Sequence, residues 1–244
     1  MGYDYSQPNH LPTQRREREP APPEELPRQR RGKTPQMRGR YPDYDVLSEA
    51  DHWDETTRRV VQDRVDSVGS IRFFTPSEAT TLTAFCDTVM AQESDPRIPV
   101  LAMVDAKLAD GRHEGYQYAD MPDDGDAWRL VARGLDDASR ERGVDCFAAA
   151  ASETRRTICK AFAGGELEGG VWRELPVSRA WSVVMRDILS AFYSHPWAWN
   201  EIGFGGPAYP RGYARLGVGQ REAWEGEEAF AVDPVGDVEA RGLD

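Results

Sequence analysis

His195 and Glu201 come closest, among the residues of this chain, to a catalytic or metal-binding pair. A histidine near a carboxylate can transfer protons, and with a third ligand it can hold a metal ion. The spacing does not match the HExxH pattern, and no pair of carboxylates lies nearby. The alternative, which we favour, is that His195 and Asn200 hydrogen-bond the backbone of their own segment and hold it rigid. His195 and Glu201 are therefore weak catalytic candidates, and the sequence predicts no metal site.

A dense run of special residues, 193–213, surrounds this pair. It holds six aromatic residues, three prolines and four glycines, a composition that fits neither an amphipathic helix nor a solvated linker. Glycine allows close backbone approach, proline fixes φ, and the rings give the segment apolar surface with which to anchor itself. The composition predicts a long ordered loop, and such a loop usually has a binding role.

The glycine-rich tetrapeptide Gly203-Phe204-Gly205-Gly206 has some likeness to a phosphate-binding loop. Such loops follow a strand and open a helix, and their backbone amides donate to the phosphate. This one follows no predicted strand, and Pro207 has no amide hydrogen to donate. Tight turns or close packing against another backbone explain the glycines better, so we expect no cofactor-binding residue in this chain.

Arg211, a guanidinium set among aromatic rings, suits two roles. It can clamp a carboxylate of a partner protein, or it can pair internally with Glu201 or a helix carboxylate, and both interpretations stay open. The aromatic residues of the run likewise fit the centre of a protein interface or ordinary core filling. Our hypothesis is that some face inward and the rest contact a partner. The residues expected to bind it are Tyr193, His195, Trp197, Trp199, Asn200, Glu201, Phe204, Tyr209, Arg211 and Tyr213.

The elements that must position this run are helical. Thr75-Pro76-Ser77-Glu78 has the pattern of a helix start, with an N-cap threonine, a proline at the first position and a glutamate that closes a capping box. Apolar residues recur at helical spacing, and no segment alternates as a strand does. The fold class is all-α: a single irregular helical bundle with a long ordered C-terminal loop and a disordered N-terminal tail. The main helices are expected at 48–68, 76–91, 100–109, 128–140, 153–163 and 178–193.

Composition divides the chain into four parts. Residues 1–45 are rich in proline and charge and nearly lack aliphatic side chains, so we expect a disordered basic tail. A helical arm is expected at 46–72, one helical domain at 73–225, and an acidic tail at 226–244.

Charge and cysteine usage exclude several kinds of partner and site. A net charge of -12 and a pI near 4.9 disfavour nucleic acid and anionic membranes as partners. Cys86, Cys146 and Cys159 lie far apart within apolar helical patterns, which is typical of buried thiols in a reducing compartment. No apolar run is long enough to insert into a bilayer. Arg15-Arg16 and Arg30-Arg31 lack the apolar stretch that follows in an export signal, so we expect a cytoplasmic protein.

Three segments resemble the gluconate 2-dehydrogenase subunit 3 family. The specific one comprises Ser194-His195-Pro196, then Asn200-Glu201-Ile202-Gly203 and Gly205 to Tyr213. Two weaker ones are Phe73-Phe74-Thr75-Pro76-Ser77-Glu78-Ala79 and Val104-Asp105-Ala106-Lys107-Leu108. The resemblance covers the block from Phe73 to Glu225. Members of the family are small helical subunits that accompany a large flavin-containing dehydrogenase of the glucose-methanol-choline type.

The resemblance implies an accessory, non-catalytic small subunit of a heteromeric FAD-dependent dehydrogenase or oxidase that acts on a sugar or another alcohol. The partner would bind FAD and substrate, and this chain would stabilise that large subunit or help to line its active-site channel. Many family members carry a twin-arginine export signal, from which this sequence departs. Two alternatives stay open: a stand-alone helical adaptor for another partner, and a small enzyme that uses His195 and Glu201.

Overall fold

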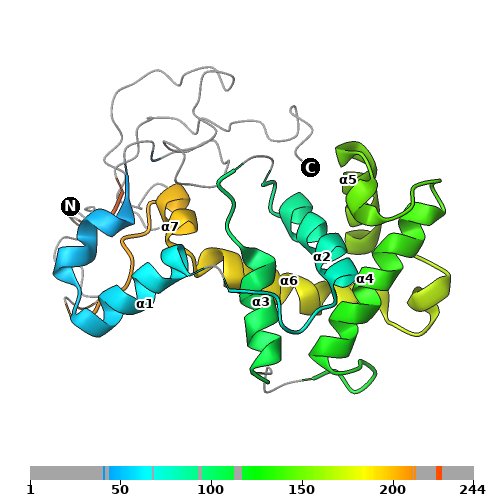
Figure 1. Cartoon of the computed structure of the whole chain (residues 1–244), viewed down its shortest axis with the longest axis horizontal. Helices are drawn as coiled ribbons and strands as arrows, with labels where there is room; N and C mark the ends of the chain where they lie inside the picture. The colour runs from blue at the N-terminus through cyan, green and yellow to red at the C-terminus, as the bar shows by residue number, and fades with distance from the viewer. Residues whose placement is uncertain are drawn as a thin grey trace, which may run out of the picture. The chain divides into compact units, whose positions relative to one another are not determined.

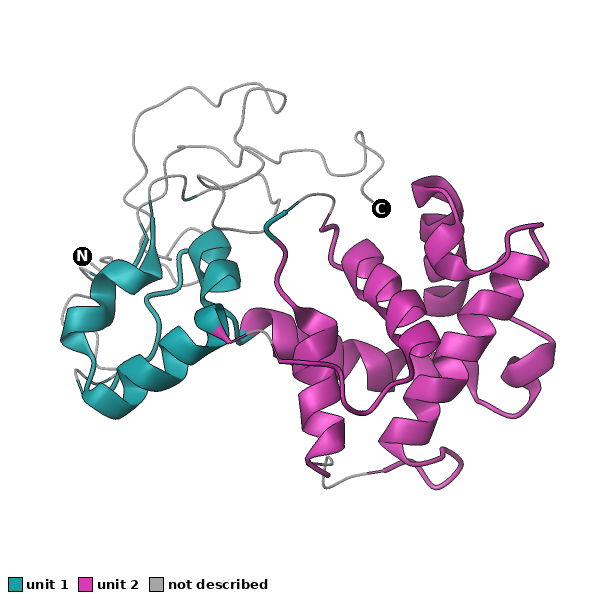
Figure 2. Cartoon of the chain, in the orientation of Figure 1, with its two compact units in different colours: residues 1–66, 94–96, 194–244 teal, residues 67–93, 97–193 magenta. Residues whose placement is uncertain are grey.

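The computed structural model in Figure 1 describes residues 41, 44–67, 69–92, 95–112, 117–210, 212 and 224–226. These residues form helices and turns, and no strand occurs among them, so the predicted all-α class is confirmed. The chain divides into two compact units, coloured in Figure 2. Unit 1 contains the described residues of 1–66, 94–96 and 194–244, and unit 2 contains those of 67–93 and 97–193. This grouping joins the C-terminal segment to the N-terminal arm and differs from the expected division at residue 73. Most of the two expected tails, 1–40 and 227–244, lies outside the described residues.

Unit 2 begins with two helices that the sequence predicts closely. Helix α2 spans Pro76–Val89, and the Thr75 side chain accepts a hydrogen bond from the amide of Glu78, whose carboxylate accepts from the amide of Thr75. This reciprocal capping box is the one expected from the residue pattern. Helix α3 spans Val100–Ala109 with the predicted bounds.

The remaining elements of unit 2 are three α-helices and two short 3-10 helices: α4 at Asp124–Arg140, η3 at Phe147–Ala149, α5 at Ser152–Gly164, η4 at Gly170–Arg173 and α6 at Val177–Tyr193. Helix α4 begins one turn before the predicted residue 128, and Asp124 and Asp126 place negative charge at its positive N-terminal end. The rings of Phe85, Phe147 and Phe162 pack together in the core, with Phe85 centroids at 6.3 and 5.9 Å from the other two.

Two of the three cysteines behave as the sequence predicts. Cys86 and Cys159 are buried, and burial raises the pKa of both thiols, that of Cys159 to about 12. Cys146, at the N-cap of the short helix η3, is only half-buried, so the expectation of a third buried thiol is corrected.

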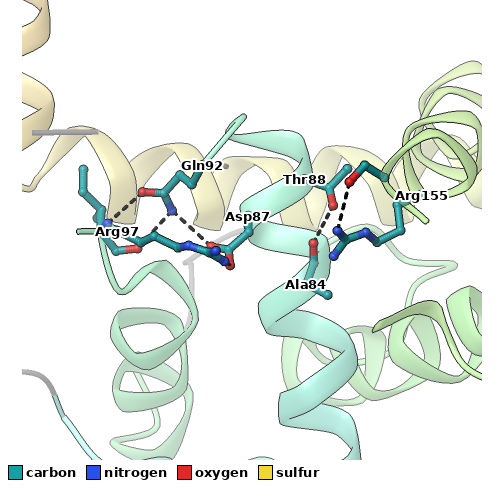
Figure 3. A network of polar contacts seen from close by, with 8 residues as sticks. Ala84, Asp87, Thr88, Gln92, Arg97 and Arg155 are labelled. Atoms are coloured by element: carbon teal, nitrogen blue, oxygen red, sulfur yellow. Dashed lines mark hydrogen bonds and ion pairs between the residues drawn. The ribbon is translucent and has the colours of Figure 1, made fainter. Parts of the chain in front are cut away.

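A polar network holds the turn between α2 and α3 (Figure 3). The buried Gln92 side chain accepts from the amide of Ile98 at 2.7 Å and donates to the Ile98 carbonyl at 3.1 Å. It also donates to Asp87 at 3.3 Å, and Arg97 forms an ion pair with the same carboxylate at 2.5 Å. Burial raises the pKa of Asp87, and the hydrogen bond from Arg97 opposes that shift. Arg97 therefore favours the ionised form of this carboxylate against the effect of burial.

We expect Arg97→Gln to destabilise unit 2 by about 1–2 kcal/mol at pH 7, because it leaves the Asp87 carboxylate without its charged partner. A raised folded-state pKa means that the unfavourable contribution grows as pH rises through that pKa and vanishes below the unfolded value. The penalty should therefore fade as the pH is lowered toward 4 in urea unfolding experiments. The double variant Asp87→Asn/Arg97→Gln is the control, since it should show no such fading. An Arg97→Gln penalty that is constant with pH would contradict this role.

Candidate partner-binding site

The composition of the run 193–213 predicted a loop throughout, but part of this run is helical. Residues Pro196–Ile202 form helix α7, and irregular backbone and turns follow it from 203 to 210. The Nδ1 atom of His195 accepts a hydrogen bond from the amide of Trp197 at 3.2 Å and so caps the helix. Pro196 occupies the first helical position, and Gly203 ends the helix with a φ of 66°. Proline at the start and a left-handed glycine at the end are ordinary helix boundaries, which the count of special residues obscured.

The N-terminal arm packs on α7 within unit 1. It consists of the 3-10 helix η2 at Val46–His52 and helix α1 at Glu55–Asp66. The single helix expected at 48–68 is thus corrected to two. The chain breaks at Trp53 because this side chain turns into the core, and the Asp54 carboxylate then accepts from the amide of Thr57 to start α1.

Asn200 joins the arm to α7 with two hydrogen bonds. Its Oδ1 accepts from the amide of Val46 at 2.7 Å, and its Nδ2 donates to the Asp45 carboxylate at 3.3 Å. Val46 is fully buried, so its amide needs this protein partner in place of water. Asn200 therefore bonds a segment more than 150 positions away, a contact that the sequence interpretation did not include.

The apolar core of unit 1 gathers Val46, Trp53, Val61 and Trp199. Gly206 lies against this cluster with a φ of 71°, and a Cβ atom there would come within 2.9 Å of the Trp53 ring. A side chain at this position would displace the core. This geometry agrees with glycine for close packing, the explanation preferred over a phosphate-binding loop.

His195 has both ring nitrogens engaged. Besides the bond from Trp197 to Nδ1, the imidazole hydrogen-bonds the backbone of Arg64, and because that bond raises the pKa it is donated to the carbonyl oxygen. Arg64 returns a bond from Nη1 to the Ser194 carbonyl at 2.7 Å. Burial, together with the Arg64 charge, lowers the pKa of His195 to about 4. The ring is 1 % exposed and neutral near pH 7, so it is poorly placed for proton transfer with a substrate.

Glu201, the second catalytic candidate, lies toward the other end of α7. The two residues are six positions apart, which corresponds to roughly 9 Å along a helix axis. Glu201 is also buried, at 5 % exposure. The helix thus separates the two side chains that their closeness in sequence had suggested as a pair.

The residues expected to bind a partner fall into three groups. His195, Trp199, Asn200 and Glu201 are buried, and Trp197 is half-buried. Exposed side chains are those of Phe204 and Tyr209 in unit 1 and Tyr193 in unit 2. Arg211 and Tyr213 lie outside the described residues.

Ile202 is an exposed apolar residue that the sequence analysis did not select. It is 45 % exposed, and Phe204 and Tyr209 are 43 % and 65 % exposed. The sequence shows only an isoleucine directly before a glycine, and its exposure follows from the helix that ends there. These three residues, which we call the apolar rim, lie within eight positions of one another.

The described residues contain neither a metal-binding cluster nor a membrane-spanning helix. No group of three or more histidine, cysteine, aspartate or glutamate side chains within them is arranged to hold a metal ion. None of the helices they form is long and apolar enough to cross a membrane. Unit 2 has a cavity of about 310 Å³ between α4, the end of α5 and η4. Its lining includes four carboxylate residues, Asp137, Glu141, Glu166 and Glu168, and the indole of Trp172, but no residue predicted from the sequence as a site.

The comparison with known families agrees with the resemblance seen in the sequence. The model of the family described as gluconate 2-dehydrogenase subunit 3 matches residues 76–206, from the start of α2 to Gly206, which lies against the Trp53 ring. No curated protein and no solved structure matches the chain. The family match covers more than half of the sequence and suggests an accessory subunit of a multi-subunit dehydrogenase. The chain belongs to the gluconate 2-dehydrogenase subunit 3 family.

Proposed function

We propose that this chain is a non-catalytic small subunit that binds and stabilises the large FAD-dependent subunit of a heteromeric sugar or alcohol dehydrogenase. In this proposal the large subunit holds the flavin and the substrate. The family match is the observation that carries the proposal, because it spans α2 to α7 and ends within the segment that bears the apolar rim. A partner that binds only the native form of the flavoprotein stabilises it by mass action.

The apolar rim supports a docking role for the end of α7. Ile202, Phe204 and Tyr209 leave large apolar surfaces in water, while most residues of α7 itself are buried. Covering such surface yields roughly 25 cal/mol per Å², and exposed apolar side chains gathered in one segment are typical of protein interfaces. Tyrosine and phenylalanine at such positions are common contributors to binding free energy.

The buried polar residues favour a subunit over a small enzyme. The two nitrogens of His195 serve the helix cap and the contact with Arg64, and Asn200 serves the contact with Val46. These residues maintain the shape of unit 1, and that shape in turn presents the apolar rim.

We expect the double variant Ile202→Ser/Tyr209→Ser to weaken binding to the proposed FAD-dependent large subunit by at least tenfold, since interface residues of this kind contribute about 1–3 kcal/mol each. Both side chains are exposed, so far-ultraviolet circular dichroism should not change. The measurement is affinity co-purification of the co-expressed pair, followed by flavin absorbance. Ile71→Ser, an equally conservative change at an exposed apolar residue of unit 2, is the matched control and should bind normally. Equal flavin recovery with the double variant and with the control would contradict docking through the apolar rim.

A further inference from the structure

Helices α1 and α7 are joined by a reciprocal pair of hydrogen bonds within unit 1. The guanidinium of Arg64 donates to the carbonyl of Ser194, and the ring of His195 donates to the carbonyl of Arg64. The Arg64 guanidinium also lies 5.8 Å from the centre of the Trp199 ring. One buried imidazole thus fixes both the N-terminus of α7 and the C-terminal turn of α1.

We propose that His195 is an acid-operated latch, which holds α1 on α7 while its ring is neutral and releases it when the ring is protonated. A second ring proton must sit on Nδ1, the atom that accepts from the amide of Trp197. Protonation would therefore remove the cap of α7 and leave an Nδ1–H donor facing the amide donor of Trp197. It would also place a second cation beside Arg64, on a ring that is itself 1 % exposed.

The charges around the latch explain why acid acts through His195. Arg64 is the charged residue that faces His195 from α1, and it opposes protonation. Asp45 precedes η2 and accepts from Asn200, and Glu201 lies toward the opposite end of α7. Asp54, which caps α1, has a pKa lowered by its hydrogen bonds with Thr57, so it titrates below the range in which the latch opens.

The direction of the pH effect follows from the lowered pKa. The folded value of about 4 lies below the ordinary value of 6.5, so the neutral ring favours the closed form. This contribution is complete above pH 6.5 and is lost as the pH falls toward 4. Between these values opening takes up one proton, and the opening equilibrium constant should rise about tenfold per pH unit, or roughly 300-fold in all. The inference does not depend on the proposed dehydrogenase partner.

Hydrogen exchange of the full chain between pH 6.5 and 4.5 tests the latch. We expect the protection factors of Val61 in α1 and Trp199 in α7 to fall about tenfold per pH unit. Those of Val131 and Leu135, in the core of unit 2, serve as the internal reference and should stay within about threefold. Parallel behaviour of the two sets of amides would overturn the proposal.

Two variants separate the latch from general acid unfolding. His195→Asn retains an acceptor near the position of Nδ1, and His195→Gln retains a donor near that of Nε2, but neither residue titrates. Either variant, if folded, should lose the pH slope at Val61, and a slope that persists would overturn the proposal. A direct test on the unaltered chain is an NMR titration of the His195 ring. A ring that stays neutral with its proton on Nε2 at pH 5.5 is expected, and a ring that titrates near 6.5 in the folded state would refute the latch.

Discussion

Trp199→Ala should destabilise unit 1 by about 3–5 kcal/mol, the range for removing a large aromatic side chain from a packed core. The side chain is 5 % exposed and packs with Val46, Trp53 and Val61. Its ring also contacts Phe204 edge-on, with the centroids 5.6 Å apart. Without this ring, η2 and α1 lose apolar surface of α7 against which they pack. The expected result is early loss of α1 and α7 protection in hydrogen exchange, with a lower midpoint in urea unfolding.

Phe204→Ala is the matched comparison for this variant, because the two rings touch but Phe204 is 43 % exposed. Its truncation should lower stability by less than about 1.5 kcal/mol. The sequence alone made Trp199 and Phe204 equal candidates for partner contact, whereas burial assigns them different roles. If Trp199→Ala leaves the unfolding of unit 1 unchanged, the assignment of Trp199 to the core is wrong. Because Trp199 belongs to the core, any effect of Trp199→Ala on partner binding should accompany unfolding of unit 1.

Local sequence signals predicted the helices that are determined locally. The capping box at Thr75 and the proline after it set the start of α2 correctly, because all the interacting groups lie within four residues. The bounds of α3 were also predicted, because Pro99 precedes its first residue and Gly111 follows its end. The observed contacts of His195 agree better with its interpretation as a structural residue than with a catalytic role.

The features that were missed depend on contacts between distant parts of the chain. At the break at Trp53 this ring enters a core shared with Trp199, and Asp54, the N-cap of α1, was the local signal for it. The partner of Asn200 is the amide of Val46, and backbone amides leave no trace in the residue pattern. Helix α7 was missed for a different reason, since seven residues are too few to show helical periodicity among so many aromatic rings.

Asp105 is the second residue at which a single substitution should have a large effect. Its side chain is fully buried, and its two oxygens accept from three consecutive backbone amides: Arg72 at 2.7 Å, Phe73 at 2.9 Å and Phe74 at 3.0 Å. This residue was named from the sequence only within a segment that resembles the family. A buried carboxylate with three amide donors is instead an anchor, which holds the segment that leads into the capping box of α2.

Asp105→Asn should therefore destabilise unit 2 by about 3–5 kcal/mol. The NH2 group of the new side chain would face backbone N–H donors, and backbone N–H groups, the buried one among them, would lose their acceptor. The measurement is urea unfolding followed by circular dichroism at pH 7. Asp110→Asn is the matched control, because Asp110 pairs with the Arg72 side chain at 2.8 Å on the exposed end of the same helix. A surface pair contributes less than about 1 kcal/mol. Equal effects of the two variants would show that charge near Arg72 matters and that the amide anchor does not. The structure predicts the opposite order, because Asp105 is itself fully buried and accepts from three amides, one of them buried, whereas Asp110 pairs with an exposed side chain.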